Sequence, residues 1–329
     1  MRSGMSDFVK AITFNSPEYI PIGVGMFRTV WRKYGKELHD IAKTHPNIFP
    51  NLGTLEEMEN RPLSWAYELG KHTDHWGFVW DNLVEGHDSF CVRSALPDLD
   101  KVDELPIPER DVGLEHGLIF LRLTYIRGYE ECMIDFAEER PEFFKLIEKV
   151  VAYGERQVAN ALSKMKPDDM VIHFGDDLGM QTSLPTGPEK WRKILKPCFC
   201  RLYKPCKDAG KLVYMHTDGC IYEIIPDLKD CGVDMINPQY RANGLDNLIY
   251  ATRGEGRHRI AVNLDLDRQL FPFATPSEID DHIMGSVDAL ALPEGGLSLS
   301  AEIDEGVPFD NIVAIFDALE KARVYMRNR

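Results

Sequence analysis

The chain has 329 residues, with 53 Asp and Glu against 38 Lys and Arg, and a formal net charge of −15. This negative balance disfavours a nucleic-acid partner and a polybasic attachment to anionic lipid, because Lys and Arg supply the contacts in both cases. The composition, with 44% hydrophobic and 28% charged residues, is typical of an ordinary soluble globular protein. No apolar run approaches the roughly 18 residues of a membrane-spanning helix, so no membrane partner is expected.

Short apolar runs rich in strand-forming residues recur along the chain. The sequence predicts eight strands, which in chain order are Ile20–Met26, His75–Trp80, Leu118–Tyr125, Met170–Phe174, Leu212–Met215, Asp234–Asn237, Ile260–Leu264 and Gly296–Ser300.

Stretches with helical spacing separate most of these strands. Pro in an opening turn supports several of them, as at Thr186-Gly187-Pro188. The predicted helical stretches are Thr29–Thr44, Glu130–Leu162, Pro188–Ala209, Cys220–Cys231, Leu245–Gly254, Pro276–Leu292 and Pro308–Tyr325.

The alternation of strands and helices predicts a parallel sheet with helices outside it. Eight such units, without a Gly-x-Gly-x-x-Gly turn after the first strand, favour an α/β fold of the (β/α)8 TIM-barrel type over a dinucleotide-binding sheet. The long, Pro-rich stretch Lys43–Arg110 is predicted to form an elaborated N-terminal loop region. No Gly/Ser-rich linker interrupts the chain, so residues 1–329 are expected to form a single domain.

The cysteines do not show the spacing of a disulfide framework, although the chain has seven of them. We therefore expect reduced thiols and a cytoplasmic protein. Cys198, Cys200 and Cys206 lie close together in a predicted helix, but positions i and i+2 do not share a helix face. A metal site made from these three cysteines is not expected.

Polar side chains follow five consecutive predicted strands, where the active site of such a barrel lies. A single Asp at the start of a loop is also common as a helix cap or turn former, but the convergence of several such groups favours a catalytic mouth. The candidates are Asp176, Asp177, His216, Asp218, Asn237, Gln239, Asn263, Asp265, Asp267 and Glu302.

His216 and Asp218 share one face of an extended chain, since side chains alternate along a strand. Both can therefore point into the predicted mouth. There they could ligate one cation, or shift each other's proton affinity without a metal. Both possibilities stay open at this point.

Several motifs in order carry a family resemblance. They include Phe174-Gly-Asp-Asp-Leu-Gly179, Pro185-x-x-Pro188-Glu189, His216-Thr-Asp-Gly219 and Gly232-Val-Asp-Met-Ile-Asn-Pro238. In this combination the chain resembles the uroporphyrinogen decarboxylase superfamily, which includes corrinoid-dependent methyltransferases. The resemblance extends back to Asp74-His-Trp-Gly77 and covers most of the chain. It implies a (β/α)8 barrel.

The decarboxylase branch of that superfamily carries a segment of the form Met-Arg-Gln-Ala-Gly-Arg that binds substrate carboxylates. The corresponding segment here, Gly25-Met-Phe-Arg28-Thr-Val-Trp-Arg32, has Arg28 but not the rest. An acidic mouth also disfavours a tetrapyrrole that carries many carboxylates. A uroporphyrinogen-type decarboxylase without metal therefore remains only an alternative.

The methyltransferase branch binds zinc through a His-x-Cys pair and a later Cys. The resemblance places His216, Asp218 and Glu302 at or near these positions, so it implies a harder Zn²⁺ site in this chain. With carboxylate ligands the zinc remains a stronger Lewis acid, which suits the oxygen of an aromatic methyl ether better than a thiol acceptor. A methyl-corrinoid:thiol methyltransferase is a further alternative. Asp176 or Asp177 could instead stabilise the departing oxygen, and a metal-free acid/base set stays open.

The resemblance implies transfer of the methyl group from a small methylated substrate to Co(I) of a corrinoid. No corrinoid-binding module is recognised in the sequence, so a separate corrinoid carrier protein is expected as partner. Trp76, Trp80 and Tyr214 are predicted to wall the substrate site, with plain core packing as the alternative. A third possibility is that the chain is a binding barrel without enzymatic activity. In that case the polar residues at the strand ends would only be solvent-facing caps.

Overall fold

The computed structural model describes residues 5–64, 67–85, 87 and 89–328. The chain folds into two compact units. The first consists of Met1–Pro62 together with Asn237–Arg329, and the second is Leu63–Ile236. The single domain expected from the sequence stays a prediction.

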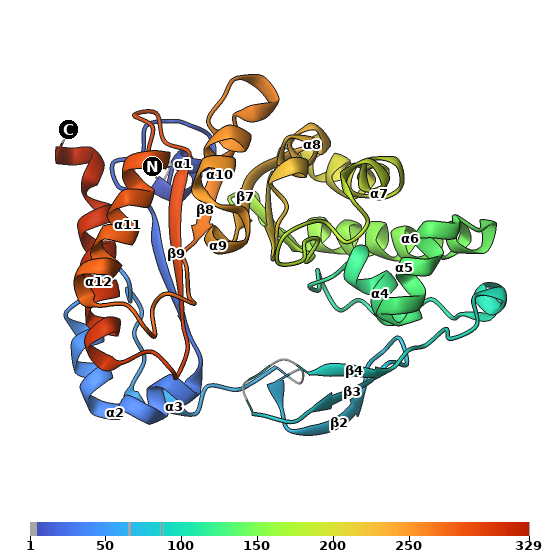
Figure 1. Ribbon diagram of the computed structural model, residues 1–329, viewed down its shortest axis with the longest axis horizontal. Helices are drawn as coiled ribbons and strands as arrows, with labels where there is room; N and C mark the ends of the chain where they lie inside the picture. Colours follow the sequence, from blue (N-terminus) through green and yellow to red (C-terminus); the bar gives the residue numbers. More distant parts are fainter. Residues whose placement is uncertain (1–4, 65–66, 86, 88, 329) are drawn as a thin grey trace. The chain divides into compact units, whose positions relative to one another are not determined.

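The first unit pairs its strands with long amphipathic helices. Helices α11 and α12 pack against each other, and α12 also contacts β9, as Figure 1 shows. The elements of this unit are α1 (Asp7–Ile12), β1 (Ile22–Met26), α2 (Arg28–Lys43), α3 (Leu55–Glu59), α9 (Tyr240–Asn243), α10 (Leu245–Thr252), β8 (Ala261–Asp265), α11 (Pro276–Leu290), β9 (Leu297–Ile303) and α12 (Phe309–Arg323).

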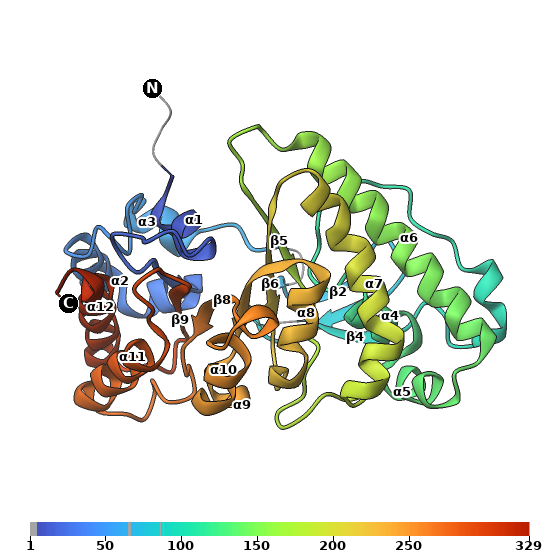
Figure 2. The ribbon, with the colours of Figure 1, turned by 90° about the horizontal axis from the view of Figure 1, so that it is seen from above.

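The second unit contains the two longest helices, α6 and α7, which run side by side (Figure 2). Its elements are β2 (Gly70–Thr73), β3 (Val79–Asn82), β4 (Phe90–Arg93), α4 (Phe120–Arg127), α5 (Tyr129–Glu138), α6 (Pro141–Lys164), β5 (Val171–Gly175), α7 (Pro188–Asp208), β6 (Leu212–Thr217) and α8 (Ile225–Cys231). Strand β7 (Val233–Pro238) follows α8, and the division between the units falls within it.

The protein is an α/β protein with a six-stranded sheet, and six of the predicted strands are confirmed in it. The order of the strands is β1-β9-β8-β7-β6-β5. The first three of these belong to the first unit, and β6 and β5 belong to the second. The pairs β1–β9, β8–β9 and β5–β6 are parallel. The pairing of the first strand with the last is the one that closes a (β/α)8 barrel. A closed barrel of eight strands is not seen in the described part of the chain.

The strand predicted at Leu118–Tyr125 is wrong, because these residues belong largely to helix α4. The helix is buried on most of its surface, so it has no polar face that would give a helical pattern. Its start is fixed by the side chain of Asp176, which is distant in sequence and accepts hydrogen bonds from the first N–H groups of the helix. The local sequence therefore shows neither an amphipathic pattern nor a capping residue for this helix.

The strand predicted at His75–Trp80 is only partly correct. Asp74 accepts the N–H groups of Trp76 and Phe78 in a turn, and strand β3 begins after it, at Val79. Strand β3 pairs antiparallel with β2 and β4 in a separate three-stranded sheet rather than joining the parallel one. The Pro-rich region predicted as an elaborated loop thus contains a small sheet of its own.

The helical predictions are confirmed in large part, with two departures. The stretch predicted at Cys220–Cys231 is an α-helix only from Ile225, after a short 3-10 turn at Tyr222–Ile224. The stretch predicted at Glu130–Leu162 is divided into α5 and α6, because Glu139 adopts a left-handed conformation with φ 54° and Pro141 opens the next helix. Among the described residues, no helix combines the length and the apolar character that a bilayer span requires.

The prediction that all cysteines are free thiols is wrong. Cys200 of α7 and Cys231 at the end of α8 form a disulfide. The two cysteines are 31 residues apart in the sequence, but they lie close in space because α7 and α8 pack against each other. The sequence alone does not show this proximity. Cys198 and Cys206 of the same helix are buried free thiols, whereas Cys200 is disulfide-bonded.

Candidate functional site

The loops that follow β5 and β6 are tied together by hydrogen bonds. The N–H of Leu178 donates to the hydroxyl of Thr217 at 3.0 Å. The N–H of Gly179 donates to the carbonyl of Asp218 at 3.1 Å. The two polar motifs that end these strands therefore form one rigid corner of the second unit.

Two glycines permit this close approach. A Cβ on Gly219 would lie 2.2 Å from the carbonyl atoms of Gly179, and Gly219 has a φ of +84° that side chains rarely allow. A Cβ on Gly179 would lie 2.4 Å from the nitrogen of Cys220. The N–H of Cys220 donates to the carbonyl of Met180 at 2.7 Å, which extends the contact. Glycine is therefore required at both positions for steric reasons.

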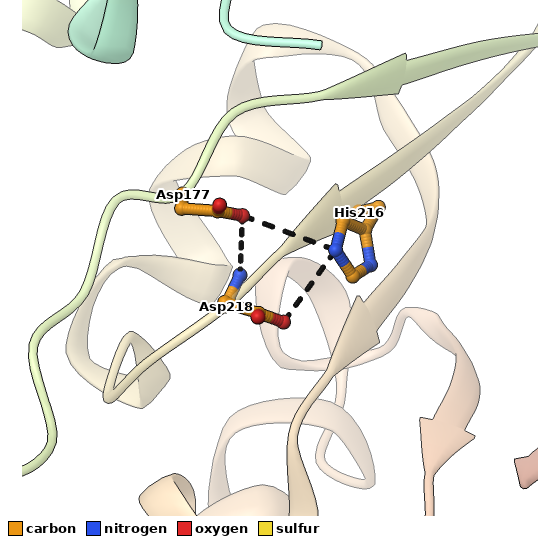
Figure 3. Close-up of side chains that lie close together, drawn as sticks. All are labelled: Asp177, His216 and Asp218. Carbon is orange, nitrogen blue, oxygen red and sulfur yellow. Dashed lines mark hydrogen bonds and ion pairs between the residues drawn. The ribbon is translucent and has the colours of Figure 1, made fainter. Parts of the chain in front are cut away.

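Asp177, His216 and Asp218 meet at this corner (Figure 3). His216 Nε2 lies 3.5 Å from Asp218 Oδ1 and 3.9 Å from Asp177 Oδ1. The N–H of Asp218 donates to Asp177 Oδ1 at 3.0 Å and fixes that carboxylate. One ligand atom from each side chain lies within 4.8 Å of the others, and all three side chains are partly buried.

This donor set fits a zinc ion. One imidazole nitrogen and two carboxylate oxygens are ligands that Zn²⁺ accepts, and three protein ligands leave a fourth position open for a substrate. No cysteine takes part, so the set is hard compared with a thiolate site. The geometry brings together His216 and Asp218, as the sequence predicts, and adds Asp177.

His116 lies next to this group and was not predicted from the sequence. Its Nε2 is 3.0 Å from Asp177 Oδ2, and its ring lies 5.6 Å from that of His216. The residue precedes the segment wrongly predicted as a strand at Leu118–Tyr125. In a barrel that position would be at the end of the strand opposite the active site. The error in secondary structure thus concealed His116.

Asp177 and His116 each shift the pKa of the other toward the charged form. Burial raises the pKa of Asp177, but the hydrogen bond and charge of His116, with help from the Asp218 N–H and His216, outweigh it and the net shift is downward. Burial lowers the pKa of His116, but Asp177 and the neighbouring carboxylates outweigh that effect and the net shift is upward. The arrangement therefore favours a carboxylate facing an imidazolium.

Asp176 has a different environment from its neighbour. Its carboxylate is buried and accepts the N–H groups of Ile119 and Phe120 at 2.8 Å and of Leu121 at 2.9 Å. Burial raises the pKa of Asp176, although these hydrogen bonds oppose the shift. Both oxygens thus cap helix α4, a structural role that is common for an Asp at the start of a loop. A catalytic role for Asp176 stays a prediction.

Two predicted acidic residues of the first unit lie in ion pairs. Glu302 of β9, predicted as a metal ligand, pairs with Arg268. Asp267 pairs with Arg241, with 2.7 Å between Nη2 and Oδ2. The role of Glu302 as a metal ligand stays a prediction.

The predicted amide residues lie at the ends of β7 and β8. The side-chain amide of Asn237 donates to the carbonyl of Asn263 at 2.6 Å, which links the two strands. Gln239 forms an isolated parallel bridge with Asp265. The contact made by Asn237 is a structural one, and the predicted contacts of these residues with a substrate remain untested.

The three predicted aromatic residues have packing partners. Trp76 and Trp80 are 3% and 8% exposed, and the ring of Trp80 lies 4.7 Å from that of Tyr125. The ring of Tyr214 lies 4.7 Å from that of His173. Core packing thus accounts for the two tryptophans, and a substrate wall made by these residues stays a prediction.

No protein-family model matches the chain, and no curated protein matches it. Among solved structures, the chain is similar to a methyltransferase from Methanosarcina mazei. The TM-score is 0.62 at 12% sequence identity, and the match covers 96% of this chain and 97% of that chain. At this identity the likeness is one of fold over nearly the full length of both chains.

Proposed function

We propose that this protein is a corrinoid-dependent methyltransferase that uses a zinc ion at Asp177, His216 and Asp218. The donor is a small methylated compound, preferably an aromatic methyl ether. The acceptor is Co(I) of a corrinoid carried on a separate protein. The observation that carries the proposal is the group of one imidazole and two carboxylates at the joined ends of β5 and β6. The methyltransferase with a similar fold supports the reaction class.

When bound, zinc would supply Lewis acidity to the ether oxygen of the donor. The residues of the chain orient the ligand set for this purpose. The Asp218 N–H and the imidazole of His116 hold the two oxygens of Asp177, so that this carboxylate is fixed before any ligand arrives. The side chain of Asp218 lies beside the Nε2 atom of His216. Such prior orientation reduces the reorganisation needed during the reaction.

The transfer breaks the bond between the methyl carbon and the ether oxygen. The electron pair of that bond leaves with the oxygen, and Co(I) supplies the pair for the new bond to carbon. The alkoxide or phenolate that departs then takes a proton from solvent. A negatively charged leaving group is the species that a cationic centre stabilises.

The proposal is tested with the full chain, cob(I)alamin and a panel of methoxylated aromatic compounds, under reducing conditions and with zinc present. We expect the absorbance of methylcobalamin to appear with at least one donor, and to be lost with His216→Ala. His258→Gln is the matched control, because His258 packs on Tyr250 in the first unit and touches none of the proposed site residues. Absence of methylcobalamin with every donor, together with conversion of uroporphyrinogen to coproporphyrinogen, would favour the decarboxylase instead.

A further inference from the structure

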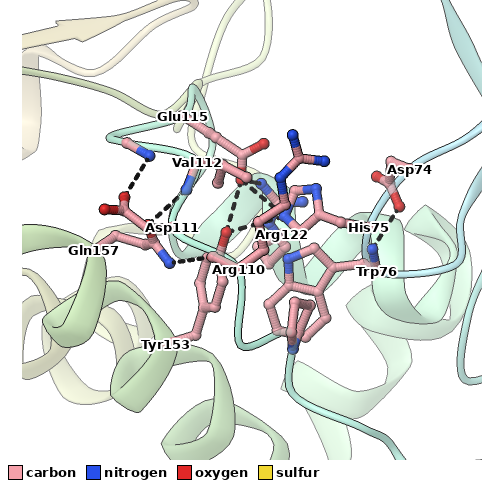
Figure 4. Close-up of polar contacts among 12 residues, drawn as sticks. Asp74, His75, Trp76, Arg110, Asp111, Val112, Glu115, Arg122, Tyr153 and Gln157 are labelled. Carbon is pink, nitrogen blue, oxygen red and sulfur yellow. Dashed lines mark hydrogen bonds and ion pairs between the residues drawn. The ribbon is translucent and has the colours of Figure 1, made fainter. Parts of the chain in front are cut away.

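A loop between β4 and α4 places two consecutive residues in two different clusters. Glu115 points into a buried polar cluster, and His116 points to Asp177. Figure 4 shows the first cluster, in which Glu115, His75, Arg122 and Tyr153 are turned toward one another. The loop thus connects this cluster to the proposed metal site through one peptide bond.

Glu115 is anchored through one of its oxygens. Oε2 accepts the hydroxyl of Tyr153 at 2.9 Å and Nη2 of Arg122 at 3.2 Å, and His75 Nε2 lies 3.3 Å away. Arg122 is 4% exposed and lies over the ring of Trp76, so the ion pair is largely shielded from water. Burial raises the pKa of Glu115, but His75 and Arg122 outweigh it and the net shift is downward. Glu115 is therefore held as a carboxylate in a fixed position.

Both ends of the loop are also held by the scaffold. The N–H of Val112 donates to the side chain of Gln157, a fully buried residue of α6, at 3.2 Å. The N–H of Gly117 donates to the carbonyl of Gly175, the last residue of β5, at 2.7 Å. The backbone on either side of Glu115 and His116 therefore has little freedom to move.

The end of β5 leaves room for the His116 ring. A Cβ on Gly175 would lie 2.4 Å from His116 Nδ1, so only glycine admits the imidazole at this place. From there His116 Nε2 reaches Asp177 Oδ2 at 3.0 Å, while Asp177 Oδ1 lies on the side of His216. The imidazole of His116 thus contacts one oxygen of the Asp177 carboxylate. The other oxygen faces the proposed metal ligand His216.

We infer that His116 is a positioning residue of the zinc site, and that the Glu115 cluster holds His116 in place. This inference rests on the proposed function, because it concerns the same site. Partners that orient a metal ligand in this way typically change metal affinity by about 10- to 100-fold when they are removed.

The first test measures the affinity of the full chain for Zn²⁺ by competition with a chromophoric chelator. We expect His116→Ala to weaken binding by about 10- to 100-fold. His116→Gln keeps an N–H donor and restores part of the affinity, whereas His258→Gln binds as the wild type does. Co²⁺ in place of Zn²⁺ gives a second readout, since its visible spectrum shifts in His116→Ala when Asp177 is reoriented. Equal affinity and equal spectra in His116→Ala and the wild type would overturn the inference.

The second test asks whether Glu115 acts through His116. Glu115→Gln weakens zinc binding when His116 is present and has no further effect in the His116→Ala background, because the loop then has no imidazole to position. Tyr153→Phe removes the contacts of the Tyr153 hydroxyl with Glu115 and His75 and keeps the ion pair between Glu115 and Arg122, so it serves if Glu115→Gln does not fold. Additive effects would overturn the anchoring role. A wild-type protein that binds no zinc would refute the metal site of the proposed function itself, a result distinct from equal binding by His116→Ala.

Discussion

The carboxylate of Asp176 caps helix α4, whereas the carboxylate of its neighbour Asp177 lies between His116 and His216. Consecutive residues at the end of a strand point in opposite directions. One of the two acids therefore faces the interior and the other faces the candidate site. The motif Gly175-Asp-Asp-Leu-Gly179 thus combines a helix-capping carboxylate with one of the proposed metal ligands.

Asp176→Asn is expected to destabilise the protein by about 2 kcal/mol, because an amide group cannot accept all three N–H groups of the helix and leaves buried donors unsatisfied. Urea unfolding monitored by circular dichroism measures this loss. Asp177→Asn, with a partly exposed side chain, is the control and is expected to change stability by less than about 1 kcal/mol. An equal effect of the two variants would contradict this division of roles.

The sequence predicts the parts of the fold that local pattern determines. The runs that became β5 and β6, and the polar residues that end them, were found because strand and loop chemistry alternate there. Helix α4 was missed because its cap comes from Asp176, which is distant in sequence. The omission of His116 follows from the same error, because a strand at Leu118–Tyr125 would place it away from the active site, whereas the structure places it beside Asp177.

Gly219→Ala is expected to cost more than about 2 kcal/mol, from the strained backbone at φ +84° and from the clash with Gly179. The matched control is Gly285→Ala in helix α11, where an added Cβ meets nothing within 4 Å. That change is expected to stabilise the protein by about 0.5–1 kcal/mol, since Gly is unfavourable inside a helix. Thermal unfolding of the two variants provides the comparison. Similar effects of the two would refute the steric role of Gly219.

In zinc-free protein, the ion pair between His116 and Asp177 is expected to make stability depend on pH. The pKa of His116 is raised, so its contribution is complete below its ordinary value and is lost as pH rises through the folded-state pKa. The pKa of Asp177 is lowered, so its contribution is lost only in acid. His116→Gln should therefore destabilise the protein more at about pH 5.5 than at about pH 9, by up to about 1 kcal/mol. Urea unfolding at both pH values measures this difference, and a difference of zero or of opposite sign would argue against the pair.

The disulfide between Cys200 and Cys231 closes a separation of 31 residues. Restricting the unfolded chain by such a loop stabilises a fold by about 3–4 kcal/mol in the chain-entropy description. Cys200→Ser should lower the urea midpoint of oxidised protein, and dithiothreitol should lower the wild-type midpoint without affecting the variant. Wild-type protein that shows the same midpoint with and without reductant would indicate that this bond contributes nothing to stability.

Zinc should stabilise the wild-type protein against thermal unfolding, by about 2.7 kcal/mol at a free concentration one hundred times the dissociation constant. The residue supplying the third ligand can be identified in the same assay. The geometry at β5 and β6 favours Asp177, so Asp177→Asn should abolish the stabilisation and Glu302→Gln, which alters an ion pair with Arg268, should retain it. The opposite pattern would restore the set His216, Asp218 and Glu302 expected from the sequence. Loss in neither variant would mean that zinc binds elsewhere.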